Sequence, residues 1–210
     1  MDQPPIFKED RIDVMHDLIK AHSFGTLVGL EDGEISANHL PLILHPEISE
    51  NGTLRGHISK ANPLWKKHDA DTNVLIIFQG AHHYISPSWY PSKREHQKVV
   101  PTWNYAVVHA RGSLKLIEDN DWILAHLNSL TNKHERGYPE PWKVSDAPEK
   151  YIAGQIKGIV GVEITIKELT GKWKMSQNKN AADKEGVLRG LKGDGDENAS
   201  TMLDIMKNDK

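Results

Sequence analysis

Residues 101–112, PTWNYAVVHARG, carry side chains that can stack on a flat ring or bind an anion. In an extended strand alternate residues share a face, so Trp103, Tyr105 and His109 fall together with Val107 and Arg111. The opposite face would carry small or compact residues, from Thr102 and Asn104 to Ala110. The face with the rings suits neither a dry core nor plain solvent exposure. It predicts a surface that meets something flat, polar or anionic.

A second segment with donor chemistry is GHISKANP, residues 56–63. A predicted strand ends near His57, and Ser59, Lys60 and Asn62 precede a short helix expected over 62–68. Helix N-termini present unpaired amides and partial positive charge, so these groups could form a phosphate site. The commoner alternative for so short a signal is an ordinary Ser or Asn cap.

A third segment, GKWKMSQNKN, closes the last predicted strand with donors beside an indole. Its polar and aromatic side chains are Trp173, Lys174, Ser176, Gln177, Asn178 and Lys179. They could hold a phosphate, a ribityl chain or a ring edge, and the alternative is a solvated strand end. Taken together, the three segments favour a ligand with a flat ring and an anionic tail. Flavin mononucleotide (FMN) is such a ligand.

Other kinds of site are not indicated. The chain has no cysteine and twelve histidines, but His82 and His83 are adjacent and would point to opposite faces of a strand. Because no tight set of metal ligands and no G-x-S-x-G nucleophile turn occurs, the sequence predicts no metal site and marks no catalytic residue.

Charge and hydropathy limit the partners. With 26 basic and 29 acidic residues the net charge is -3, so diffuse attraction to nucleic acid or an anionic membrane is not expected. The start of the chain lacks the pattern of a secretory signal, and the longest apolar run, VLIIF, is too short to span a bilayer. We therefore expect a cytoplasmic protein.

The spacing of apolar residues predicts an α+β fold. Helices are expected over 10–22, over 120–135 with a stripe of Ile123, Leu124, Leu127 and Leu130, and over 145–158 with Ser145 or Asp146 as N-cap. Strands are expected over 23–44 in a hairpin, and over 50–59, 72–80, 82–90, 101–118 and 158–169. Six or seven strands with peripheral helices favour a small, mostly antiparallel barrel over residues 1–180, followed by a charged helical extension over 181–210.

Several blocks together resemble a known family. They are SFGTLV, ANHLPL, GHISKANPLW, NVLIIFQGAHHYISPSWY, VPTWNYAVVHARG, KGIVGVEI and KMSQNKN. In order and spacing they are similar to the PaiB-type FMN-binding negative transcriptional regulators of bacteria. The resemblance implies a split β-barrel of the pyridoxamine-phosphate-oxidase-like kind, and a homodimer that holds FMN at the subunit interface.

The same resemblance implies site residues. The phosphate and ribityl end of FMN would lie near His57, Ser59, Lys60 and Asn62. The ring edge or the subunit interface would be served by Trp103, Asn104 and Tyr105. Lys174, Gln177 and Asn178 would complete the site, from the same chain or the second one.

Three functions stay open at this level. The family implies regulation of transcription. An acidic chain with GDGDEN between its last two helices is a poor candidate for reading DNA directly. Regulation through a protein partner or a metabolite is therefore at least as plausible. The first alternative is a flavin-dependent oxidoreductase acting on a small molecule, with His82, His83 and Tyr84 on the substrate side. The second is a haem-binding split barrel.

Overall fold

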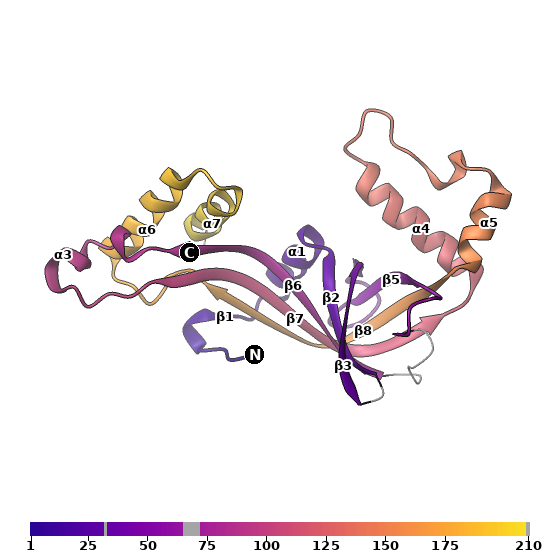
Figure 1. Cartoon of the computed structure of the whole chain (residues 1–210), viewed down its shortest axis with the longest axis horizontal. Helices are drawn as coiled ribbons and strands as arrows, with labels where there is room; N and C mark the ends of the chain where they lie inside the picture. The colour runs from indigo at the N-terminus through magenta and orange to yellow at the C-terminus, as the bar shows by residue number, and fades with distance from the viewer. Residues whose placement is uncertain (32, 65–71, 209–210) are drawn as a thin grey trace. The chain divides into compact units, whose positions relative to one another are not determined.

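The computed structural model of the protein describes residues 1–31, 33–64 and 72–208 (Figure 1). The chain divides into two compact units. Unit 1 comprises Met1–Leu18, Gln79–His109 and Thr170–Lys210, and unit 2 comprises Ile19–Phe78 and Ala110–Leu169. Three long strands have residues in both units.

The described residues form an eight-stranded sheet of order β3-β2-β6-β7-β8-β5-β4, with β1 paired to β8. The strands are β1 Lys8–Glu9, β2 Phe24–Glu31, β3 Glu34–Pro41, β4 Ile43–His45, β5 Thr53–Ser59, β6 Thr72–Ile85, β7 Thr102–Ile117 and β8 Ile159–Lys174. Pairs such as β2 with β3 and β5 with β8 are antiparallel. The predicted α+β split barrel is confirmed, and the very short β1 and β4 account for the larger strand number.

The described residues also form helices. They are α1 Ile12–Ala21, α3 Ser92–His96, α4 Asn120–Glu135, α5 Glu149–Lys157, α6 Ala181–Asp194 and α7 Glu197–Asn208, with single 3-10 turns η1 Pro5–Phe7, η2 Pro87–Trp89 and η3 Val144–Asp146. The short helix expected over 62–68 falls mostly on residues 65–71, which lie outside the described residues. No helix in the described part of the chain is long and apolar enough to cross a membrane.

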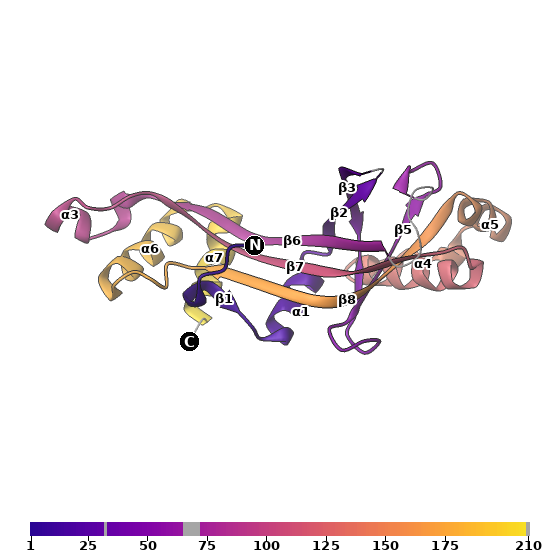
Figure 2. The same ribbon diagram turned by 90° about the horizontal axis from the view of Figure 1, so that it is seen from below.

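In unit 2, helix α4 lies beside α5 (Figures 1 and 2). The Trp122 ring of α4 packs on β8 at Gly161. Asp119 caps α4, since its Oδ1 accepts from the Trp122 N–H at 2.7 Å. A Cβ added at Gly161 would lie 2.4 Å from Cζ3 of Trp122, so only glycine lets the indole approach the strand. The core beneath includes Leu54, Val162 and Ile164, all fully buried.

In unit 1, helix α6 packs on η2 through two glycines one turn apart. A Cβ at Gly186 would lie 2.0 Å from the carbonyl oxygen of Trp89. A Cβ at Gly190 would lie 2.1 Å from Cδ2 of the Trp89 ring. The other side of α6 contributes the fully buried Val187, and α7 lies next to it. A domain boundary at residue 180 stays a prediction.

Three local predictions are wrong, each for a physical reason. The strands expected over 72–80 and 82–90 are one strand, β6, which ends at Ile85 because Pro87 opens η2. Helix α5 begins at Glu149 with Pro148 as N-cap, rather than with Ser145 or Asp146. On α4 the buried residues are Ile123 and His126, whereas the predicted stripe residue Leu124 is exposed.

Candidate functional site

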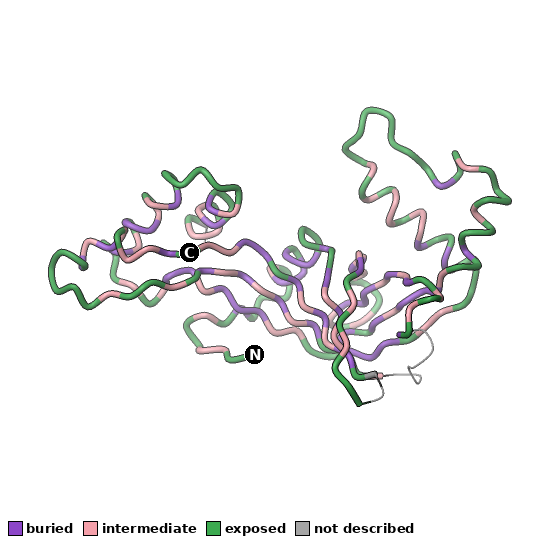
Figure 3. Tube along the Cα trace, in the orientation of Figure 1, coloured by how far each residue is buried: buried purple, intermediate pink, exposed green. Residues whose placement is uncertain are grey.

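Strand β7 has the two unlike faces that the sequence predicts (Figure 3). In unit 1 the inner face carries Asn104, Ala106 and Val108, each with no exposed surface. The residues on the opposite face of β7 are exposed to solvent to different degrees, and Trp103 keeps 52% of its surface exposed. A tryptophan in that position is available to a ligand or to another chain.

Trp103 belongs to a small exposed group of rings, which we call the outer aromatic group: His82, Tyr84 and Trp103. The ring centroids of His82 and Trp103 are 6.2 Å apart, and those of Tyr84 and Trp103 are 6.1 Å apart in an edge-on arrangement. Tyr105 lies two residues further along β7, and the ammonium of Lys172 on β8 lies 5.7 Å from the centre of its ring. This surface can stack a flat ring and offers imidazole and phenol groups beside it.

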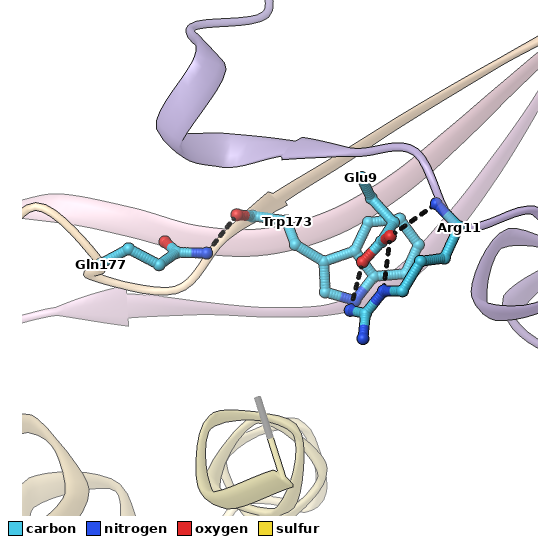
Figure 4. A network of polar contacts seen from close by, with 4 residues as sticks. All are labelled: Glu9, Arg11, Trp173 and Gln177. Carbon is cyan, nitrogen blue, oxygen red and sulfur yellow. Dashed lines mark hydrogen bonds and ion pairs between the residues drawn. The ribbon is translucent and has the colours of Figure 1, made fainter. Parts of the chain in front are cut away.

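The segment after β8 uses much of its polar chemistry internally (Figure 4). The Gln177 side chain donates from Nε2 to the Trp173 carbonyl at 2.7 Å and accepts from the Met175 N–H at 2.6 Å. Its amide therefore closes the turn at Ser176, whose φ is +62°. Close by, Glu9 accepts three hydrogen bonds from Arg11, and these donors lower the pKa of the Glu9 carboxyl.

Two further predicted residues of unit 1 are also paired inside the protein. Asn104 donates from Nδ2 to the hydroxyl of Ser176 at 3.0 Å, and both side chains are buried. Lys174 donates from Nζ to the Thr102 hydroxyl. Asn178 is exposed. Within unit 1, Trp103 and Asn178 thus reach the surface, while Asn104 turns inward.

In unit 2 the segment from Ser59 to Asn62 forms a compact turn. The Ser59 hydroxyl oxygen accepts from the Ala61 N–H at 3.1 Å, and the Asn62 side-chain oxygen accepts from the Leu64 N–H at 2.9 Å. The capping alternative therefore applies to both residues. It does not use the Ser59 hydroxyl proton, which can still be donated to an anion. The Lys60 ammonium is held 3.5 Å from the Glu118 carboxylate.

The remaining predicted residue, His57, faces a histidine that sequence reasoning missed. Its Nδ1 lies 3.2 Å from Nε2 of His126, whose side chain is 4% exposed and whose Nδ1 has no partner in the described structure. Burial, followed by the nearby charges of His57, His45 and Arg55, lowers the pKa of His126 to about 4. Burial also lowers the pKa of His57, so both rings are neutral near neutral pH.

The predicted site residues thus form two groups. Unit 2 holds His57, Ser59, Lys60 and Asn62, and unit 1 holds Trp103, Asn104, Tyr105, Lys174, Gln177 and Asn178. Within these groups, Asn104 is buried against Ser176 while Trp103 is exposed, and His57 faces His126. Their assignment to one cofactor site stays a prediction.

Solved structures share this architecture. An FAD and heme binding protein from Mycobacterium smegmatis matches with a TM-score of 0.60 and 14% identity, covering 87% of this chain and 80% of the other. The flavocytochrome Anf3 from Azotobacter vinelandii matches with a TM-score of 0.58 and 14% identity, covering 80% of this chain and 69% of the other. At such low identity these matches establish the fold, and the class of protein is an antiparallel split barrel.

Sequence comparison defines the family more closely. The family model described as "Putative FMN-binding domain" matches residues 1–168. The "Protease synthase and sporulation protein PAI 2" of Bacillus subtilis is 34% identical over 204 residues, spanning 97% of this chain and 95% of the relative. An uncharacterized protein of Emericella nidulans is 32% identical over 237 residues, spanning 96% of this chain and 94% of the relative. This chain belongs to that FMN-binding family, and FMN is the cofactor that the sequence predicts.

Proposed function

We propose that this protein is a cytoplasmic homodimer that binds FMN at its subunit interface and regulates transcription through a partner or a metabolite rather than by reading DNA. The observation that carries the proposal is the outer aromatic group, with Tyr84 and Trp103 exposed, opposite the buried Asn104, Ala106 and Val108 of β7, in a chain of an FMN-binding family. A stacking surface of this kind suits the isoalloxazine ring.

The turn after β5 supports the phosphate end of the proposed site. Ser59 has a hydroxyl proton to donate, and Lys60 supplies a positive charge, so both suit a phosphate monoester. Neutral His57 would act as a hydrogen-bonding group there rather than as a cation. When bound, FMN supplies redox chemistry, while the chain's own residues bind it, orient it and limit access of water.

The regulatory part of the proposal rests on the relative named for protease synthesis and sporulation. Direct DNA binding is disfavoured by the net charge of -3 and by the link between α6 and α7, where Asp194, Asp196 and Glu197 lie close in sequence. These carboxylates would repel phosphates. An effect on transcription would then pass through a protein partner or a small molecule.

The first test is a titration of the purified protein with FMN, following flavin fluorescence, with the mass of the same sample measured by light scattering. Quenching that saturates at one flavin per chain on a dimer supports the proposal. A dimer that fails to bind FMN would leave the aromatic surface as a subunit contact alone. At low salt, a random-sequence DNA duplex should bind this protein no more tightly than it binds an acidic control protein of similar size.

A second candidate function is flavin-dependent oxidation or reduction of a small molecule. It is favoured by His82 and Tyr84, which place an imidazole and a phenol beside Trp103, where a stacked flavin would expose its edge. The test is oxidation of NADH or NADPH by the FMN-loaded protein. Steady turnover lost in His82→Ala, with FMN binding intact, would favour this function over a purely regulatory one. A haemin titration followed by absorbance tests the haem alternative.

A further inference from the structure

A cavity of about 710 Å³ lies in unit 1, between η2 and the segment that follows α3. Its lining residues are Pro87, Ser88, Tyr90, Lys93, Arg94, Gln97 and Val99. None of them belongs to the groups that the proposed FMN site uses. The volume lies within the range of pockets for drug-sized ligands, so a molecule the size of a nucleotide can be accommodated.

The charge of this cavity has one sign. Lys93 and Arg94 are its only charged lining residues in the described structure, so no carboxylate among them offsets the two cations. The Lys93 ammonium donates to the Ser88 hydroxyl at 3.3 Å, which directs it toward a second lining residue. The Arg94 guanidinium has no hydrogen-bond or ion-pair partner among the described residues. A planar guanidinium with unused donors is suited to bidentate contact with a phosphate.

Tyr90 forms part of the cavity wall. The residue is 2% exposed, and its hydroxyl has no hydrogen-bond partner in the described structure, which is costly for a buried polar group. Burial and the charge of Asp183 raise the pKa of this phenol, so it stays protonated and remains a donor. The Lys179 ammonium lies 4.8 Å from the centre of the Tyr90 ring.

The negative charge of the Asp183 carboxylate is compensated by hydrogen bonds, so it does not prevent an anion from binding nearby. Its Oδ1 accepts from the Ser92 N–H at 3.1 Å, and its Oδ2 accepts from the Ser92 hydroxyl at 2.8 Å and from the Asn180 amide at 3.2 Å. The carboxylate is itself buried and fully engaged in joining α3 to the start of α6.

A neighbouring cavity of about 560 Å³ shares Ser88, Tyr90 and Arg94 but differs in charge. It is also lined by Glu95 and Arg189, and Arg189 is paired with Glu185 at 3.1 Å. Since acidic groups offset the cations there, an anion is better served by the larger cavity. Arg189 therefore provides a matched control for Arg94.

We propose that the larger cavity binds the phosphate group of a small phosphorylated metabolite, a phosphate monoester of about nucleotide size. Arg94 and Lys93 neutralise the dianion, the Ser88 hydroxyl donates to one of its oxygens, and the rest of the cavity accommodates the organic part. Such a site goes beyond FMN binding and would give a regulator an input from metabolism.

The test is calorimetric titration of the full-length, FMN-saturated protein with adenosine monophosphate, with adenosine and inorganic phosphate as companion probes. We expect the monophosphate to bind at least about tenfold more tightly than adenosine. Arg94→Gln should weaken it by about tenfold or more. Arg189→Gln should leave the affinity within about twofold, because its charge is already paired.

Several results would overturn this proposal. One is the absence of binding of both the monophosphate and inorganic phosphate at millimolar concentration; another is equal loss in Arg94→Gln and Arg189→Gln. Binding only to flavin-free protein, with displacement by FMN, would instead identify the cavity as part of the flavin site. The FMN affinity of each variant is measured separately, so a failure of this proposal and a failure of FMN binding are distinguishable.

Discussion

The Nδ1 atom of His57 lies 3.2 Å from Nε2 of His126, and the two rings meet edge to face with centroids 5.3 Å apart. On its other side, His126 stacks on Trp122 at 5.6 Å, and the Arg55 guanidinium lies 5.4 Å from the Trp122 ring centre. Arg55 is in turn paired with Glu163 at 2.8 Å. This chain of contacts fixes α4 on β5 and β8 within unit 2, and it requires a neutral His126.

That requirement predicts acid sensitivity. The pKa of His126 is about 4 in the folded protein and 6.5 ordinarily, so the unfolded chain binds more protons at mildly acidic pH. The stabilisation is complete above pH 6.5 and is lost as the pH falls toward 4, by at most about 3 kcal/mol in the free energy of unfolding. Urea unfolding between pH 7 and 5 measures the slope of stability against pH.

The matched variant for this measurement is His126→Phe, which keeps a ring against Trp122 and removes the titrating group. Its free energy of unfolding should depend less steeply on pH between 6.5 and 5 than that of the wild type. Equal slopes in the two proteins would show that His126 stays protonated or accessible in the folded state.

A second prediction separates two tryptophans. Trp103→Ala should abolish or strongly weaken FMN binding or dimerisation, with little change in stability, because Trp103 is 52% exposed. Trp122→Ala should instead lower the free energy of unfolding by about 2–3 kcal/mol, since the indole fills the space above Gly161 and supports His126. Flavin fluorescence, scattering mass and urea unfolding of both variants check this. If Trp103→Ala and Trp122→Ala affected flavin binding and dimerisation equally, the assignment of Trp103 to the site would be refuted.

A third prediction concerns the glycines of α6. Gly190→Ala places a methyl group 2.1 Å from the Trp89 ring, so it should lower the free energy of unfolding by about 2 kcal/mol or more. Gly193→Ala on the same helix meets no atom within 4 Å and should stabilise by about 0.5–1 kcal/mol through helix propensity. The pair is compared by thermal unfolding. Destabilisation of similar size in both would mean that α6 does not pack on Trp89 as described.

The sequence predicted the regular features well because they depend on local periodicity. The two faces of β7 follow from alternation, and the buried Val160, Val162 and Ile164 of β8 follow from the same rule. The pairing of His57 with His126 could not be predicted, since it joins positions 69 residues apart that only the packing of α4 brings together. An i, i+4 spacing of Trp122 and His126 on one helix was the only available signal.

Burial of polar side chains was equally hard to foresee. Asn104 was grouped with its aromatic neighbours Trp103 and Tyr105, although strand alternation alone puts it on the other face. In the structure it is fully buried against Ser176, which adopts a left-handed backbone conformation. A non-glycine residue at positive φ depends on tertiary context, so no local pattern marks it.

The last prediction tests the phosphate end of the proposed flavin site. Lys60→Gln removes a cation from the turn that Ser59 and Asn62 build, and it should weaken FMN binding by about tenfold. The turn itself should survive, because its hydrogen bonds come from the Lys60 backbone and from neighbouring side chains. Lys157→Gln, on the exposed end of α5, is the control and should leave FMN affinity unchanged. If riboflavin, which lacks the phosphate, loses as much affinity as FMN in Lys60→Gln, then Lys60 does not contact the phosphate, and the anion is bound elsewhere.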